Sequence, residues 1–61
     1  MNTKSLTPLL TLEDAAEHCR VSIKTVRRWI DTHELPAAKL GNQWRIRPED
    51  LRHFILDRLD R

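Results

Sequence analysis

The segment VSIKTVRRWI, residues 21–30, carries the strongest secondary-structure signal in the chain. Ser22 is a favourable N-cap, because its hydroxyl can accept a hydrogen bond from a backbone N–H group of the first helical turn. Ile23, Val26 and Ile30 recur at helical spacing and share one face, while the three cations of the segment fall on the other. The segment therefore predicts an amphipathic helix with a buried apolar face and an exposed basic face.

A second helix is predicted immediately before it, in the segment LLTLEDAAEHC at residues 9–19. Thr11 is a favourable N-cap, and Asp14 stands three residues later, where it can complete a capping box. The apolar stripe of this helix consists of Leu12, Ala15, Ala16 and Cys19. Because only the short segment CRVS connects the two helices, they are predicted to form a helix-turn-helix. The second helix of such a motif presents its N-terminal residues to a major groove.

The segment AAKLGNQWRIRP, residues 37–48, loses the helical period, and its alternation of polar and apolar residues predicts a β-hairpin. Two registers are open. A two-residue loop would place Lys39 opposite Trp44, which is unfavourable because it sets a cation beside the most apolar residue. A three-residue loop at residues 41–43 would leave Lys39 and Arg45 together on the outer face. The second register, which we expect, has the pairs Leu40–Trp44 and Ala38–Ile46.

The segment RPEDLRHFILDRL, residues 47–59, predicts a last helix with Pro48 at its first position. Its expected inward face consists of Leu51, Phe54, Ile55 and Leu59. The predicted fold is α+β and mostly helical. It is a winged helix-turn-helix, in which a two-stranded β-hairpin, the wing, lies between the second and third of three helices. We expect this domain to span residues 9–61, after a flexible N-terminal tail at residues 1–8.

The composition favours a small globular domain that is not an enzyme. Of the 61 residues, 39% are hydrophobic and 33% are charged. A chain of this length buries only about 60% of its unfolded surface, which leaves little room for a catalytic pocket. No histidine, cysteine, serine or carboxylate set has the spacing of a catalytic or metal site, so we expect neither, and no cofactor. Short apolar runs exclude a membrane span, and the N-terminus lacks the core of a signal peptide, so we expect a cytoplasmic protein.

Charge is distributed unevenly along the chain. The net charge is +2, yet residues 20–47 carry seven Lys or Arg residues against two acidic residues, for +5. Residues 1–19 carry −2 and residues 48–61 carry −1. A basic middle of this kind is typical of a surface that binds a polyanion, although a salt-bridged surface would give the same count.

Taken together, the segments LLTLEDAAEHCRVSIKTVRRWI, HELPAAKLGNQWRI and RPEDLRHFI resemble the excisionase-type DNA-binding domain, a relative of the MerR-type winged fold. The resemblance covers residues 9–56 and rests on the combination of the capped serine, ELPA, the glycine followed by WRI, and EDL. It departs from the family pattern at Arg20, where a glycine is usual. If the backbone there is left-handed, a non-glycine residue costs about 1 kcal/mol. The resemblance implies a DNA-binding excisionase of a phage or plasmid, or a small transcriptional regulator.

The expected DNA contacts lie on the recognition helix and the wing. Those of the helix are Ser22, Lys24, Thr25, Arg27 and Arg28. Those of the wing are Lys39, Asn42, Gln43 and Arg45, and further phosphate contacts are Arg20 and Arg47. Thr25 and Arg28 are the candidates for reading base edges, because a guanidinium can bond guanine bidentately. We also expect Asp31 to pair with Arg27 or Arg28, and Trp29 and Trp44 to lie in the core.

These observations lead to the hypothesis of a sequence-specific factor that binds double-stranded DNA. The resemblance implies that it binds near a recombination site, bends the DNA and biases a partner integrase or recombinase toward excision. The uneven charge adds head-to-tail self-association on DNA, with an acidic end of one copy against the basic side of the next. Because the chain has no heptad repeat, we expect a monomer in free solution. The alternatives are a small transcriptional regulator with the same fold and a protein-interaction module. No membrane partner is expected, and the protein would be associated with the nucleoid.

Overall fold

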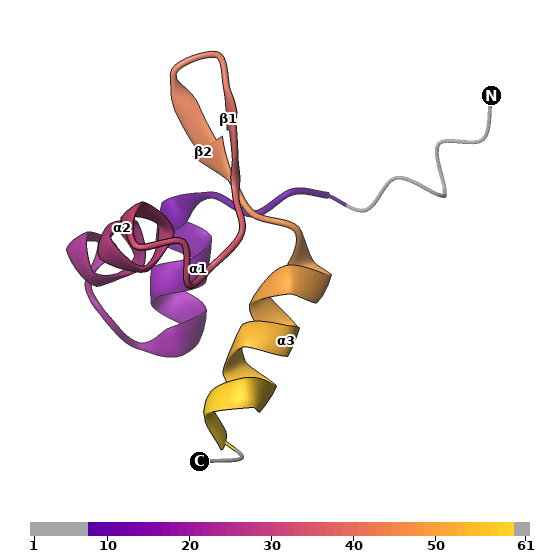
Figure 1. Ribbon diagram of the computed structural model, residues 1–61. Coiled ribbons are helices and arrows are strands. Elements are labelled where there is room, and N and C mark those ends of the chain that lie inside the picture. Colours follow the sequence, from indigo (N-terminus) through magenta and orange to yellow (C-terminus); the bar gives the residue numbers. More distant parts are fainter. Residues whose placement is uncertain (1–7, 60–61) are drawn as a thin grey trace, which may run out of the picture.

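The computed structural model describes residues 8–59, which form three helices and one two-stranded sheet (Figure 1). The helices are α1 (Leu12–Cys19), α2 (Ile23–Asp31) and α3 (Pro48–Leu59), and the strands are β1 (Ala38–Leu40) and β2 (Gln43–Arg45). The antiparallel hairpin lies between α2 and α3 in the chain and projects from the helical body. This arrangement confirms the predicted winged helix-turn-helix. Of the predicted tail at residues 1–8, all but Pro8 lie outside the described residues.

Side chains close to the backbone define both ends of α1. Thr11 and Asp14 form the predicted capping box, in which each backbone N–H donates to the other residue's side chain over 3.0 Å. At the other end, Arg20 adopts the left-handed conformation, with φ 58° and ψ 46°, and its N–H donates to the carbonyl oxygens of Ala16 and Glu17. The turn between α1 and α2 is therefore the tight left-handed turn that the helix-turn-helix requires.

The core lies where the three helices meet the base of the wing. The buried side chains are Ala15, Ala16, Val26, Ile30, Leu35, Ile46, Leu51 and Phe54. Ala15 and Ala16 of α1 have small side chains, so α2 can approach α1 closely. Val26 of α2 is completely buried in this contact. Leu35 and Ile46 come from the segments that lead into and out of the wing, and they are at most 1% exposed.

The segment before α1 is attached to the end of the wing. The N–H of Leu10 donates to the carbonyl oxygen of Ile46 over 2.8 Å, and the N–H of Ile46 donates to that of Leu10 over 2.9 Å. Because Ile46 is also buried in the core, this bridge fixes the base of the hairpin relative to α1.

The register of the hairpin differs from our prediction. The loop has two residues, Gly41 and Asn42, and the pairs are Ala38–Arg45, Lys39–Trp44 and Leu40–Gln43. Gly41 has a φ of 64° at the first loop position, where both primed turns of two-residue hairpins require a positive φ. The expected penalty for Lys39 beside Trp44 is absent, since the ammonium lies 5.5 Å from the ring centroid, in the range of a cation–π attraction. The three-residue loop was therefore wrong.

The inward face of α3 is shorter than predicted. Leu51 and Phe54 are buried and Ile55 is half-buried, but Leu59 is 72% exposed. The reason is length: α3 has 12 residues and α1 has 8, so the last turn of α3 extends beyond the helices that it packs against (Figure 1). Within residues 8–59, no helix is long and apolar enough to cross a membrane.

Candidate nucleic-acid interface

The N-terminus of α2 is organised by two hydroxyl groups. The Oγ of Ser22 accepts a hydrogen bond from the N–H of Thr25 over 3.1 Å, which confirms the predicted cap. The same oxygen lies 3.0 Å from the Oγ1 of Thr25, so the two hydroxyls are hydrogen-bonded to each other. Thr25 is half-buried, and its hydroxyl would have to share or exchange this bond in order to contact a base.

The cations of α2 lie on its exposed side, as the sequence predicts. Lys24, Arg27 and Arg28 are exposed, whereas Val26 and Ile30 are buried on the opposite side. Within residues 8–59, none of the three cations takes part in an ion pair. Three unpaired cations on one face of a rigid helix are available to phosphates and base edges.

The predicted pairing of Asp31 with Arg27 or Arg28 is wrong, because the described residues contain no such ion pair. Exposed helical pairs stabilise a helix by only about 0.2–0.5 kcal/mol, and the order with the cation N-terminal to the acid is the weaker one. Arg28 instead helps, weakly, to lower the pKa of Glu34 in the segment that follows α2.

The C-terminal half of α2 is anchored to α3. Trp29 is half-buried, and its ring centroid lies 4.7 Å from that of Phe54, at an interplanar angle of 46°. The hydroxyl of Thr32 donates to the carboxylate of Glu34, which also pairs with Arg58 of α3. These two bonds lower the pKa of Glu34, the Thr32 bond contributing most. The anchoring confirms that Trp29 packs inward.

A groove with a volume of about 360 Å³ lies between the wing and α2, and we call it the wing groove. It brings together five of the predicted contacts, Arg27, Lys39, Asn42, Gln43 and Arg45. It is also lined by Trp44, which is half-buried and packs against the core with only part of its ring. The prediction of Trp44 as a core residue is therefore right in part, because the side chain packs against the core and also lines the groove.

Arg45 and Lys39 lie on opposite faces of the hairpin, because the observed register pairs Arg45 with Ala38 and Lys39 with Trp44. The guanidinium of Arg45 donates to the carbonyl oxygen of Trp44 over 2.9 Å and to the side chain of Gln43. These bonds orient Arg45 and occupy the acceptor of Gln43. Of the wing cations, Lys39 is the more exposed, since Arg45 is half-buried.

The two predicted phosphate contacts outside α2 and the wing differ in availability. Arg20 is exposed on the turn between α1 and α2 and forms no ion pair within the described part of the chain. Arg47 donates to both carboxylate oxygens of Asp50, over 2.7 and 2.9 Å, and lies 3.5 Å from Glu49. The bond to Asp50, followed by its charge, raises the pKa of Arg47. Arg47 must therefore give up part of this pairing to reach a phosphate.

Besides Trp44, four residues that line the wing groove were not predicted as contacts: Thr11, Leu12, Glu13 and Ile23. Ile23 is 42% exposed and lines the groove beside Arg27, although its position on the helix suggested the core. Glu13 contributes an acidic side chain from the first turn of α1. The only sequence signal for Ile23 is its place at the edge of the apolar stripe, where a side chain can face either the core or the groove.

Cys19 packs against the core as a partly buried side chain, as predicted. Burial raises the pKa of its thiol, so the thiol stays protonated at neutral pH and is a weak nucleophile.

The fold, the capped basic helix and the cationic wing define a DNA-binding helix-turn-helix domain. The chain belongs to a family of helix-turn-helix domains, whose model matches residues 9–58. The match extends from the segment before α1 almost to the end of α3 and includes every predicted contact residue. Domains of this family bind DNA and are typically without enzymatic activity. No curated protein and no solved structure matches the chain.

Proposed function

We propose that this chain is an excisionase-like factor of the cytoplasm and nucleoid, which binds specific double-stranded DNA near a recombination site. The observation that carries the proposal is the placement of Arg27 of α2 and the polar side chains of the wing around one groove, with Lys24 and Arg28 exposed on the same helix. A major groove accepts a helix such as α2, and a hairpin beside it can follow the backbone into the adjacent minor groove.

The contacts divide into base readers and phosphate binders. Arg28 is the main base reader, because its guanidinium is exposed, unpaired and able to bond guanine bidentately. Thr25 reads a neighbouring base through its methyl group or by exchanging its bond with Ser22. Lys24 and Arg27 bind phosphates on either side of the groove.

The remaining contacts follow the DNA backbone away from α2. Lys39 and Arg45 of the wing bind phosphates, and Asn42 and Gln43 at its tip approach the minor groove. Arg20 binds a phosphate beside the N-terminus of α2, with Arg47 as a secondary contact.

The excisionase role extends this DNA binding to recombination. Copies bound at adjacent sites contact one another head to tail, bend the DNA and favour excision by a partner integrase. A transcriptional regulator would use the same DNA contacts. The two roles are separated by an excision assay with a cognate integrase, in which a regulator would not change the ratio of excision to integration.

DNA binding itself is tested by its salt dependence. The proposed phosphate binders are five cations: Arg20, Lys24, Arg27, Lys39 and Arg45. The slope of log affinity against log salt concentration should therefore be about −4 to −5 on duplex DNA. A slope near zero, or the absence of binding at low salt, would refute the proposal.

Two substitutions distinguish residues that read bases from residues that bind phosphates. Arg28→Ala should cost about 1–3 kcal/mol on the specific site and reduce discrimination, whereas Lys39→Ala should weaken binding to all sequences alike. Fluorescence anisotropy titrations with the specific and a scrambled duplex measure both effects. If Arg28→Ala weakens the two duplexes equally, Arg28 binds a phosphate, and base reading belongs to another residue of α2.

A further inference from the structure

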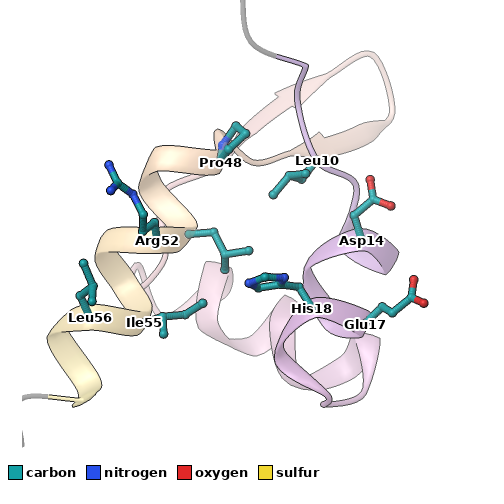
Figure 2. Close-up of a pocket in the computed structure, with 9 residues that line it drawn as sticks. Leu10, Asp14, Glu17, His18, Pro48, Arg52, Ile55 and Leu56 are labelled. Carbon is teal, nitrogen blue, oxygen red and sulfur yellow. The ribbon is translucent and has the colours of Figure 1, made fainter.

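A second concave surface lies between α1 and α3, away from the wing groove (Figure 2). It has a volume of about 800 Å³, and we call it the back groove. Its lining residues are Leu10, Asp14, Glu17, His18, Pro48, Leu51, Arg52, Ile55 and Leu56. It shares no residue with the wing groove. Aliphatic side chains of Leu10, Ile55 and Leu56 are among those that line it.

The two walls of the back groove differ in charge. Asp14 and Glu17 stand on the α1 side, and Arg52 stands on the α3 side (Figure 2). Glu17 and Arg52 form no ion pair with any described residue. His18 points from α1 across the groove toward α3. A ligand with a cation beside the α1 wall and an acidic group beside the α3 wall would match the charges of Glu17 and Arg52.

The α3 wall continues into exposed leucines. Arg52, Ile55, Leu56 and Leu59 follow one another at spacings of one to three residues along one side of the helix. Leu56 is 49% exposed and Leu59 is 72% exposed. The side of α3 that borders the groove therefore carries projecting apolar side chains together with an unpaired cation.

We propose that the back groove binds α3 of a second copy of this chain, in a two-fold symmetric dimer. The same surface carries the groove, the two opposite charges and the exposed leucines that can enter the groove of another copy. It is therefore self-complementary, as an isologous contact requires. With the two α3 helices antiparallel, Leu59 of each copy reaches the end of the groove near Leu10 and Pro48. Arg52 of each copy faces Glu17 of the other.

The dimer leaves the DNA-binding residues uncovered. The wing groove takes Leu12 and Glu13 from α1, whereas the back groove takes Asp14, Glu17 and His18. Each dimer therefore presents two separate DNA-binding faces and can hold two duplex segments. The contact does not depend on the proposed function, because it forms between free copies without DNA. It is a different contact from the head-to-tail one between copies on DNA, and it replaces the sequence-based expectation of a monomer in free solution.

Sedimentation equilibrium of the full chain without DNA, from micromolar to millimolar concentration, tests the proposal. A reversible monomer–dimer equilibrium is expected. Leu59→Gln should raise the dimer dissociation constant roughly 30-fold or more, since each dimer loses two buried leucines. Leu59 is exposed in the monomer, so this variant should fold normally. The matched control is Leu40→Gln, which removes a leucine that is 53% exposed on the wing and should leave dimerisation unchanged.

A charge exchange tests the geometry. Glu17→Arg and Arg52→Glu should each weaken the dimer about 5–30-fold, because the two-fold axis repeats the lost pair. The double variant should recover most of the wild-type affinity, with circular dichroism confirming that all variants are folded. A monomer at every concentration, self-association only on DNA, equal effects of Leu59→Gln and Leu40→Gln, or no recovery in the double variant would each overturn the proposal.

Discussion

Replacement of Arg20 by glycine should stabilise the domain and weaken its binding to DNA at the same time. Arg20 has a φ of 58° and a ψ of 46°, a left-handed conformation that costs a residue with a Cβ roughly 1–2 kcal/mol. Glycine removes this cost but adds about 0.4–1 kcal/mol of unfavourable backbone entropy on folding. The net gain in the free energy of unfolding is therefore about 0.5–1 kcal/mol. For a domain of this size, the gain raises Tm by roughly 2–8 °C.

Binding should change in the opposite direction, because Arg20 is an exposed cation beside the N-terminus of α2. The loss of one phosphate contact should reduce the magnitude of the salt slope by about 1 and weaken specific and random duplexes alike. Thermal unfolding followed by circular dichroism and anisotropy titrations at several salt concentrations measure the two effects on the same preparation.

His33 provides a matched control, because it is the other non-glycine residue with a positive φ in the described chain, at 63°. His33→Gly should raise Tm by a similar amount and leave the salt slope unchanged. Arg20→Ala should alter the salt slope as Arg20→Gly does, without the gain in stability. If Arg20→Gly lowers Tm, the side chain of Arg20 stabilises the turn by more than the backbone strain, and the reasoning is refuted.

Two further predictions concern the ends of α2. Ser22→Ala should lower the free energy of unfolding by about 1 kcal/mol in urea denaturation, because the N–H of Thr25 loses its side-chain acceptor and keeps only the carbonyl oxygen of residue 22. An unchanged value would show that α2 does not depend on this cap. The hydrogen bond from Thr32 and the charge of Arg58 lower the pKa of Glu34 in the folded state. The ionised carboxylate therefore contributes its full stabilisation above the ordinary pKa of a glutamate. This stabilisation is lost as the pH falls through the lowered pKa. Glu34→Gln should therefore flatten the loss of stability between neutral and acidic pH, and an unchanged pH profile would contradict this assignment.

The parts of the fold that could be predicted from the sequence are those set by neighbouring residues. The capping box of Thr11 and Asp14 and the cap at Ser22 are local hydrogen bonds with a known residue pattern. The apolar spacing of α2 also determines which of its side chains face solvent, so the cations were placed correctly. The family match at residues 9–58 agrees with these local signals.

The errors arose where competing energies are small or where the packing partner is distant in sequence. Two effects competed for the hairpin register. Gly41 favours the first position of a two-residue loop, whereas we assumed that Lys39 opposite Trp44 would be unfavourable. The loop preference of Gly41 was the stronger effect. The exposure of Leu59 depends on the length of α1, because α1 ends before it reaches the last turn of α3. The apolar pattern of α3 alone gives no information on that length. The pairing of Asp31 rested on an exposed contact worth only a few tenths of a kcal/mol.

The position of the wing relative to α2 is set by residues that contact no DNA in the proposed complex. α2 is held by Val26 against Ala15 and Ala16, while the base of the wing is held by the bridge between Leu10 and Ile46. Both attachments meet at α1, so α1 acts as the common support of the two DNA-binding elements. Ala15 is completely buried, so a larger side chain at this position would shift α2 relative to the wing. This shift would weaken DNA binding although no DNA-contacting residue is replaced. Specificity in this small domain therefore depends on the packing of α1 as much as on the exposed cations.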